Sequence, residues 1–170
     1  MEIIKTATDW AKAEVFSSLF FILFGVLFIS ATIGFWQIGK TDVAKAYIYP
    51  TLVSGILLLM VGVGILYANK VRETSFVSSY QENPTEFIDT ELVRTEKIIG
   101  EYQTAVFTVI PFIVIAAALI IFFLQTPIWR AIGITTIALM SCVMLIDSNA
   151  SKRVKDYHEA LIIAKQSLNQ

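Results

Sequence analysis

The sequence has little that could perform catalysis or hold a metal ion. Among its 170 residues there is one histidine, His158, and one cysteine, Cys142. A zinc site is built from several histidine, cysteine or carboxylate ligands, and these two residues alone cannot assemble one. No glycine-rich phosphate loop, serine elbow or cysteine–histidine pair is present in the sequence either. We therefore expect a protein that is not an enzyme and that binds no cofactor.

Charge is also scarce in this chain. Charged residues make up 16% of the sequence and hydrophobic residues 56%, and the apolar residues come in long unbroken runs. The hydrocarbon core of a bilayer is about 30 Å thick, so a helix needs roughly 20 apolar residues to cross it. Four runs free of charged side chains have or approach this length: residues 15–38, 46–68, 102–125 and 131–146. Because a soluble bundle would need polar outer faces, these runs indicate membrane-spanning helices.

The first run has a second interpretation, a cleaved signal peptide. Such a peptide has an apolar core of about 7–15 residues directly after a basic start. Residues 15–38 are longer and follow a stretch of mixed charge, so we interpret them as a retained helix. The sequence then predicts an all-α polytopic membrane protein, with four transmembrane helices in two hairpins extended into a small cytosolic helical bundle. Its predicted parts are an N-terminal interfacial segment (1–14), a first hairpin (15–68), a cytosolic helical segment (69–101), a second hairpin (102–147) and a cytosolic amphipathic helix (148–170).

The lysines and arginines predict how the chain is oriented. If the N-terminus is cytoplasmic, ten of the 13 positive side chains lie on that side, and only Lys40, Lys45 and Arg130 lie opposite. Positive residues in short loops concentrate on the cytoplasmic side of a membrane. We therefore expect both termini in the cytoplasm. The composition and short loops suit a bacterial inner (plasma) membrane, with the lipid bilayer as the first partner and no nucleic acid.

The segment 69–101 is predicted to form two helices separated at "ENP". Asn83 can cap the second helix, Pro84 fits its first position, and Glu86 places an acid in its first turn. No strong helix breaker follows, so we expect this helix to continue into the third apolar run. Its apolar face recurs at spacings of four and three, the seam of a helix that packs on another helix. That face consists of Ile88, Leu92, Thr95, Ile99, Tyr102 and Val106.

The C-terminal segment 148–170 repeats this pattern. Its apolar face consists of Val154, Tyr157, Leu161, Ala164 and Leu168. Residues 69–101 hold four positive and seven negative side chains, whereas residues 148–170 hold four positive and two negative. We expect the two faces to cover one another, joined by Phe76, Val77 and Tyr80; the alternative is two unrelated solvated faces, since exposed ion pairs are weak. The predicted cytosolic interaction stripe is Ile88, Leu92, Ile99, Tyr102, Val154, Tyr157, Leu161 and Leu168.

Within the four apolar runs there is no Asp, Glu, Lys, Arg or His, which argues against a proton-coupled transporter. Glycines in the runs allow helices to approach closely: Gly25, Gly55, Gly62, Gly64 and Gly133. Hydroxyl side chains either hold helices together or, in an oligomer, line a water-filled path. The candidates for these roles are Thr104, Thr108, Thr135, Thr136 and Ser141. Pro111 removes a backbone hydrogen bond in the third run, and is therefore a hinge candidate.

Arg153 and His158 stand in an Arg-x4-His spacing. This spacing resembles the motif of HEPN ribonucleases, in which the two residues assemble a composite site across a helical dimer. The resemblance covers six residues, and Val154 stands where that family commonly has a polar residue. On one helix the two side chains lie about 140° apart. We therefore interpret the basic cluster around Arg153 as a charge anchor after the fourth run, and His158 as a solvated surface residue.

Two functions fit this sequence about equally well. The first is a homo-oligomeric, channel-like or membrane-perturbing effector controlled by its cytosolic helices. The second is a non-conducting membrane anchor or scaffold subunit, which binds a cytosolic partner through the interaction stripe. A third hypothesis, an enzyme using Arg153 and His158, predicts that replacing His158 by alanine abolishes activity.

Overall fold

The computed structural model describes residues 2–168, and over this range the chain is helical without any strand. The elements are α1 (Glu2–Ile38), α2 (Asp42–Ala46), α3 (Ile48–Glu82), α4 (Pro84–Thr104), the π-helical turn η1 (Ala105–Val109), α5 (Ile110–Phe123) and α6 (Pro127–Leu168). The predicted segments 1–14 and 148–170 also include residues 1, 169 and 170, which lie outside the described range.

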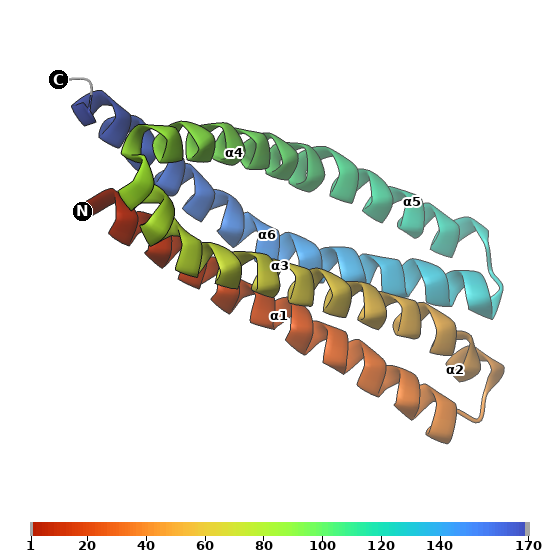
Figure 1. Ribbon diagram of the computed structural model, residues 1–170. Coiled ribbons are helices and arrows are strands. Elements are labelled where there is room, and N and C mark those ends of the chain that lie inside the picture. Colours follow the sequence, from red (N-terminus) through yellow and green to blue (C-terminus); the bar gives the residue numbers. More distant parts are fainter. Residues whose placement is uncertain (1, 169–170) are drawn as a thin grey trace.

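The long helices run alternately up and down, with α4, η1 and α5 forming one continuous stretch (Figure 1). The first residues of α1, the last residues of α6 and the α3–α4 turn lie at one end, which we call the polar end. The α1–α3 and α5–α6 connections lie at the opposite, apolar end. Four helical stretches are long and apolar enough to cross a membrane by length and composition.

No helix breaks where an apolar run meets a polar segment. α3 continues from the second run to Glu82, and α6 continues from the fourth run to Leu168. The predicted extension of these runs into polar helices is therefore confirmed as continuous helix. Helix α1 behaves in the same way, because residues 2–14 form its first turns.

The turn between α3 and α4 has the predicted capping geometry. Asn83 has an extended backbone, and its side-chain oxygen accepts a hydrogen bond from the Glu86 backbone N–H at 3.2 Å. Pro84 occupies the first turn of α4, where a missing N–H costs nothing. The helix break predicted at "ENP" is confirmed.

Glycines bring α1 and α3 into close contact. A Cβ added to Gly55 would lie 3.0 Å from the Gly25 carbonyl oxygen, and one added to Gly62 would lie 3.0 Å from the Ile22 backbone nitrogen. Gly133 plays the same part between α6 and α5. The prediction was wrong for Gly64, because no atom of another helix lies within 4 Å of the position its Cβ would take.

The polar-end core is a cluster of apolar side chains from α1, α3, α4 and α6. Its buried members are Ile3, Ala7, Trp10, Ala11, Phe76, Phe87, Ile88, Tyr157 and Leu161. The faces of α4 and α6 predicted to cover one another do meet here, with Phe76 and the partly buried Tyr80. Val77 is exposed instead. The contribution of α1 was not anticipated, since residues 2–14 carry no long apolar run.

Candidate functional site

A buried ion pair joins the first and last helices just outside the predicted membrane spans. The Arg153 guanidinium of α6 donates to Glu14 Oε1 of α1 through Nε at 3.1 Å and Nη2 at 3.0 Å. Nη2 also donates to the Ser17 hydroxyl at 2.7 Å. Glu14 is 6% exposed, and burial raises the pKa of its carboxyl while Arg153 opposes that shift. The charge anchor predicted at Arg153 is thus an interhelical contact.

A second polar group lies one turn closer to the polar end. Glu91 of α4 forms an ion pair with Arg94 and accepts a hydrogen bond from the Tyr157 hydroxyl of α6 at 2.8 Å. The Arg94 guanidinium lies 4.7 Å from the centroid of the Trp10 ring, which stacks on Tyr157 at 5.2 Å. Burial, together with Glu91, raises the pKa of the Tyr157 hydroxyl. These contacts tie α1, α4 and α6 together.

The prediction that His158 is a solvated residue was wrong. His158 is partly buried, and its Nδ1 lies 2.7 Å from the hydroxyl of Thr95 on α4. Thr95 itself is fully buried. Since Arg153 contacts α1 while His158 contacts α4, the structure does not bring the two side chains of the Arg-x4-His spacing together within one chain.

One exposed ion pair supports the charge complementarity expected between the two polar segments. Lys165 of α6 lies 2.8 Å from Asp89 of α4. Both side chains are about half exposed, so this pair adds little stability. The buried polar contact between these two segments is the hydrogen bond from Tyr157 to Glu91. Arg153 instead joins the C-terminal segment to Glu14 of α1.

The hydroxyl candidates do not converge on one interior path in the single chain. Thr104, Thr108 and Ser141 are exposed, Thr136 is partly buried and Thr135 is buried. Thr104 donates to the Gly100 carbonyl and Ser141 to the Ile137 carbonyl, so each is satisfied by its own helix. Two other hydroxyls in the apolar runs meet between helices: Thr32 of α1 lies 2.8 Å from Thr51 of α3. Neither residue stood out in the sequence among the many apolar-run hydroxyls.

Most of the predicted interaction stripe is covered by the chain itself. Ile88, Val154, Tyr157 and Leu161 are each at most 1% exposed. Leu92, Ile99 and Tyr102 are partly buried, and Leu168 is exposed. The seam therefore closes within one molecule in this structure. Pro111 lies in the first turn of α5, directly after the π-helical turn η1, and its role as a hinge stays a prediction.

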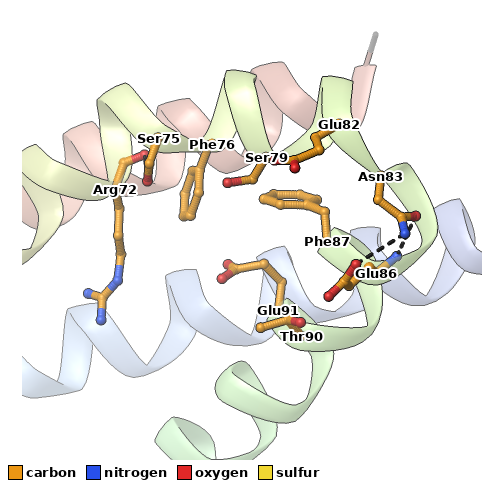
Figure 2. Close-up of a pocket in the computed structure, with 10 residues that line it drawn as sticks. All are labelled: Arg72, Ser75, Phe76, Ser79, Glu82, Asn83, Glu86, Phe87, Thr90 and Glu91. Atoms are coloured by element: carbon orange, nitrogen blue, oxygen red, sulfur yellow. Dashed lines mark hydrogen bonds between the residues drawn. The ribbon is translucent and has the colours of Figure 1, made fainter.

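A furrow runs along the side of α3 that faces α4 and α6; we call it the α3 furrow. It consists of four adjoining hollows, and each shares lining residues with the next. Counted from the apolar end, the first and second hollows share Leu57 and Leu139. The second and third share Ile65, Tyr102 and Asp147. The third and fourth share Arg72. Figure 2 shows the hollow nearest the polar end, where Arg72 extends from α3 and Glu91 lies on α4.

The charged side chains of the α3 furrow line its two hollows nearer the polar end. Trp10, Glu14, Arg72, Glu101 and Asp147 line a hollow of about 400 Å³. Burial and the neighbouring Glu14 raise the pKa of Asp147 to about 6. Burial and Arg94 lower the pKa of Arg72. Three carboxylates and one guanidinium therefore line the open volume of this hollow.

Within residues 2–168, no group of three or more histidine, cysteine, aspartate or glutamate side chains is placed to hold a metal ion. Comparison with family models, curated proteins and solved structures finds no match for this chain. The fold itself defines the class of protein, an up-and-down bundle of four long apolar helical stretches.

Proposed function

We propose that this chain is an integral membrane protein with four spans and both termini in the cytoplasm of a bacterial inner membrane. The four long apolar helices and the ten-to-three distribution of positive side chains support this placement. The buried ion pairs then lie at the cytoplasmic boundary of the bilayer. The polar-end core is the cytosolic bundle.

Within the membrane, we propose a homo-oligomeric, channel-like effector controlled by the cytosolic bundle. The observation that carries this proposal is the exposure of Thr104, Thr108 and Ser141 on the outside of one chain. Hydroxyls on the outer surface gain a function where several copies surround a shared, water-filled path. Control from the bundle follows from helix continuity, because α3 and α6 pass unbroken from the polar-end core into the spans.

Copy number tests this proposal first. The protein is reconstituted in lipid nanodiscs, and its subunits are counted by native mass spectrometry. A closed ring of four or more copies supports a channel, and ion flux across liposomes is then measured for Thr108→Val. We expect reduced flux for this variant and unchanged flux for Thr74→Val, a matched exposed control in the cytosolic part of α3. One or two copies would exclude a central path.

A non-conducting anchor is the second candidate function. It is supported by exposed apolar residues that remain at the polar end after the stripe is buried. Ile163 is 67% exposed and Leu168 is 47% exposed, and both line a shallow hollow beside the start of α1. A partner helix could cover this surface. A protein of one or two copies whose liposomes show no flux would favour this function.

A further inference from the structure

The α3 furrow is an open side of the bundle. Among the described residues α6 contacts both α3 and α5, but no Cα atom of α3 lies within 8 Å of one in α5. Figure 1 shows α6 between these two helices. The α3 side chains on this side are therefore covered only in part, and those that line the two hollows nearest the apolar end include three that are about half exposed: Val53, Leu57 and Val61.

The two hollows nearer the polar end form an acidic section of the furrow. They are lined by six carboxylates and by one positive side chain, Arg72. Two of the carboxylates are paired, Glu14 with Arg153 and Glu91 with Arg94. The other four carboxylates are those of Glu82, Glu86, Glu101 and Asp147. Within the described residues, only one of these four forms an ion pair, the exposed contact of 3.8 Å to Lys97. The section therefore carries a surplus of negative charge.

The outer face of α1 has the complementary pattern, and we call it the α1 stripe. Its exposed residues, from the polar end into the first apolar run, are Lys5, Lys12, Phe16, Leu19, Leu23 and Val26. Their spacings of seven, four and three place them on one side of the helix. Neither lysine forms an ion pair within the described residues. The exposed carboxylates of this segment lie at the margin of the stripe, since Asp9 and Glu2 are about 60° and 80° from Lys12 around the helix.

The apolar parts of the furrow and of the stripe lie at the same depth along the bundle. Phe21 of α1 lines the same hollow as Leu57 and Val61 of α3. Leu19 and Leu23 are two positions before and after Phe21, so each lies about 3 Å from its depth. In a ring whose axis is normal to the bilayer, every copy holds a given residue at the same depth. The apolar stripe of one copy is therefore level with the apolar section of the next.

The charged parts match in depth as well. Glu14 lines the acidic section, and Lys12 lies about 3 Å nearer the polar end on the same helix. Lys5 lies between two residues that line one hollow with Tyr80, which is two positions before Glu82. Both lysines of the stripe are therefore level with carboxylates of the furrow.

We propose that the α3 furrow receives the α1 stripe of a second copy, so that copies of the chain join head to tail. The lysines of the stripe then meet the acidic section, and its apolar residues cover the open part of α3. Such a contact uses two different surfaces of each chain and closes into a ring where the rotation permits. Neither surface includes Thr108 or Ser141, which stay free to line the shared path. This inference rests on the homo-oligomer in the membrane proposed above and names the surfaces that join its copies.

Disulfide cross-linking in membranes tests the interface. Two differently tagged copies, both with Cys142→Ser, are expressed together, one with Val61→Cys in the furrow and the other with Leu23→Cys in the stripe. We expect oxidation to join the two tagged copies, whereas neither variant expressed alone should form dimers, because the furrow meets the stripe and not itself. Phe112→Cys in place of Leu23→Cys is the control, since Phe112 is 73% exposed on α5 and should give no cross-link.

Charge variants test the acidic section. Lys12→Glu should lower the yield of the Val61–Leu23 cross-link by about fivefold, because like charges then meet across the interface. Glu101→Lys on the copy that supplies the furrow should restore the yield. Lys155→Glu is the matched control, an exposed lysine on the outer face of α6 that belongs to neither surface. An unchanged yield with Lys12→Glu would place Lys12 outside the interface and overturn the proposal.

The interface and the proposed function fail in different ways. A closed ring in nanodiscs without the Val61–Leu23 cross-link would leave the oligomer intact and overturn this interface alone. A protein of one or two copies would contradict both, since a head-to-tail contact does not end at two copies. Cross-linking of Val61→Cys to another protein, in place of a second copy, would assign the furrow to a partner helix with a basic cytoplasmic end and would also overturn the proposal.

Discussion

At the scale of single residues, Glu14 and Arg153 form an ion pair that joins α1 to α6, the first and last long helices. The Glu14 side chain is 8% exposed and that of Arg153 is 29% exposed. Removing an ion from water costs several kcal/mol, and a partner repays that cost only with good geometry. Arg153 meets this condition, because two of its nitrogens reach one carboxylate oxygen and one of them also reaches Ser17.

Arg153→Met should destabilise the protein by about 2–3 kcal/mol, since it leaves the Glu14 carboxylate buried without its partner. Thermal unfolding in detergent, followed by tryptophan fluorescence, measures this loss. Lys97→Met is the control, because Lys97 belongs to an exposed pair and should change stability by less than about 0.5 kcal/mol. The double variant Glu14→Gln/Arg153→Met should lose less than the sum of the single losses, and strict additivity would show that the pair does not interact.

Asp147 predicts a dependence of stability on pH. Its pKa is raised from 3.8 to about 6 in the folded chain, so the folded state binds this proton more tightly than the unfolded state does. Below about pH 4, Asp147 is protonated in both the folded and the unfolded state and does not reduce the free energy of unfolding. As the pH rises from about 4 to 6, the unfolded state loses this proton first, and the folded state loses stability. Allowing for partial exposure, the loss is on the order of 1 kcal/mol. The charged groups facing it are Glu14, Glu101 and Arg72.

Asp147→Asn should therefore melt at a higher temperature than wild type at pH 7.5, in delipidated detergent micelles. The two proteins should melt alike at pH 4. Asp156→Asn, an exposed carboxylate on the same helix, provides the matched control and should follow wild type at both values. An Asp147→Asn protein that is less stable at pH 7.5 would mean that the carboxylate has a favourable partner.

At the scale of elements, the glycine contact between α1 and α3 defines the first hairpin. Gly55→Leu should cost about 1–3 kcal/mol, because a side chain there would meet both Ile29 and the Gly25 carbonyl. Gly34→Leu adds the same side chain to α1 in open space and should be neutral or slightly stabilising, since leucine favours helix over glycine. Thermal unfolding of the two variants in the same detergent gives the comparison. Equal melting temperatures would contradict close packing at Gly55.

Helices and their ends were largely predictable, because they depend on neighbours in sequence. The apolar runs predicted four long helices, and Asn83 with Pro84 predicted the start of α4. The partners of Arg153 and His158 were not predictable in this way. Arg153 binds a residue 139 positions away, and His158 one 63 positions away. Periodicity shows which face of a helix is apolar, but not which polar residue another helix brings to it.

At the scale of the whole molecule, the same reasoning explains why the role of α1 was missed. Residues 2–14 mix charged and apolar side chains, so they lack the long run that marks a span. Their buried residues Ile3, Ala7 and Trp10 nevertheless supply one wall of the polar-end core. As a result, the first and last segments of the chain pack against each other, which requires both to lie on the same side of a membrane.

Together with the proposed cytoplasmic location of both termini, that requirement predicts which positions can be labelled in intact cells. In a background where Cys142 is replaced by serine, Lys40→Cys in the α1–α2 connection should react with an impermeant maleimide from outside. Lys97→Cys on α4 should react only after the membrane is permeabilised. Both positions are exposed, so the difference reports on the bilayer rather than on burial within the protein. The reverse pattern would overturn the orientation. If the cysteines at positions 40 and 97 both react in intact cells, the two positions lie on the same side of the membrane. In that case α3, which lies between them in the chain, does not cross the membrane, and the assignment of spans is wrong.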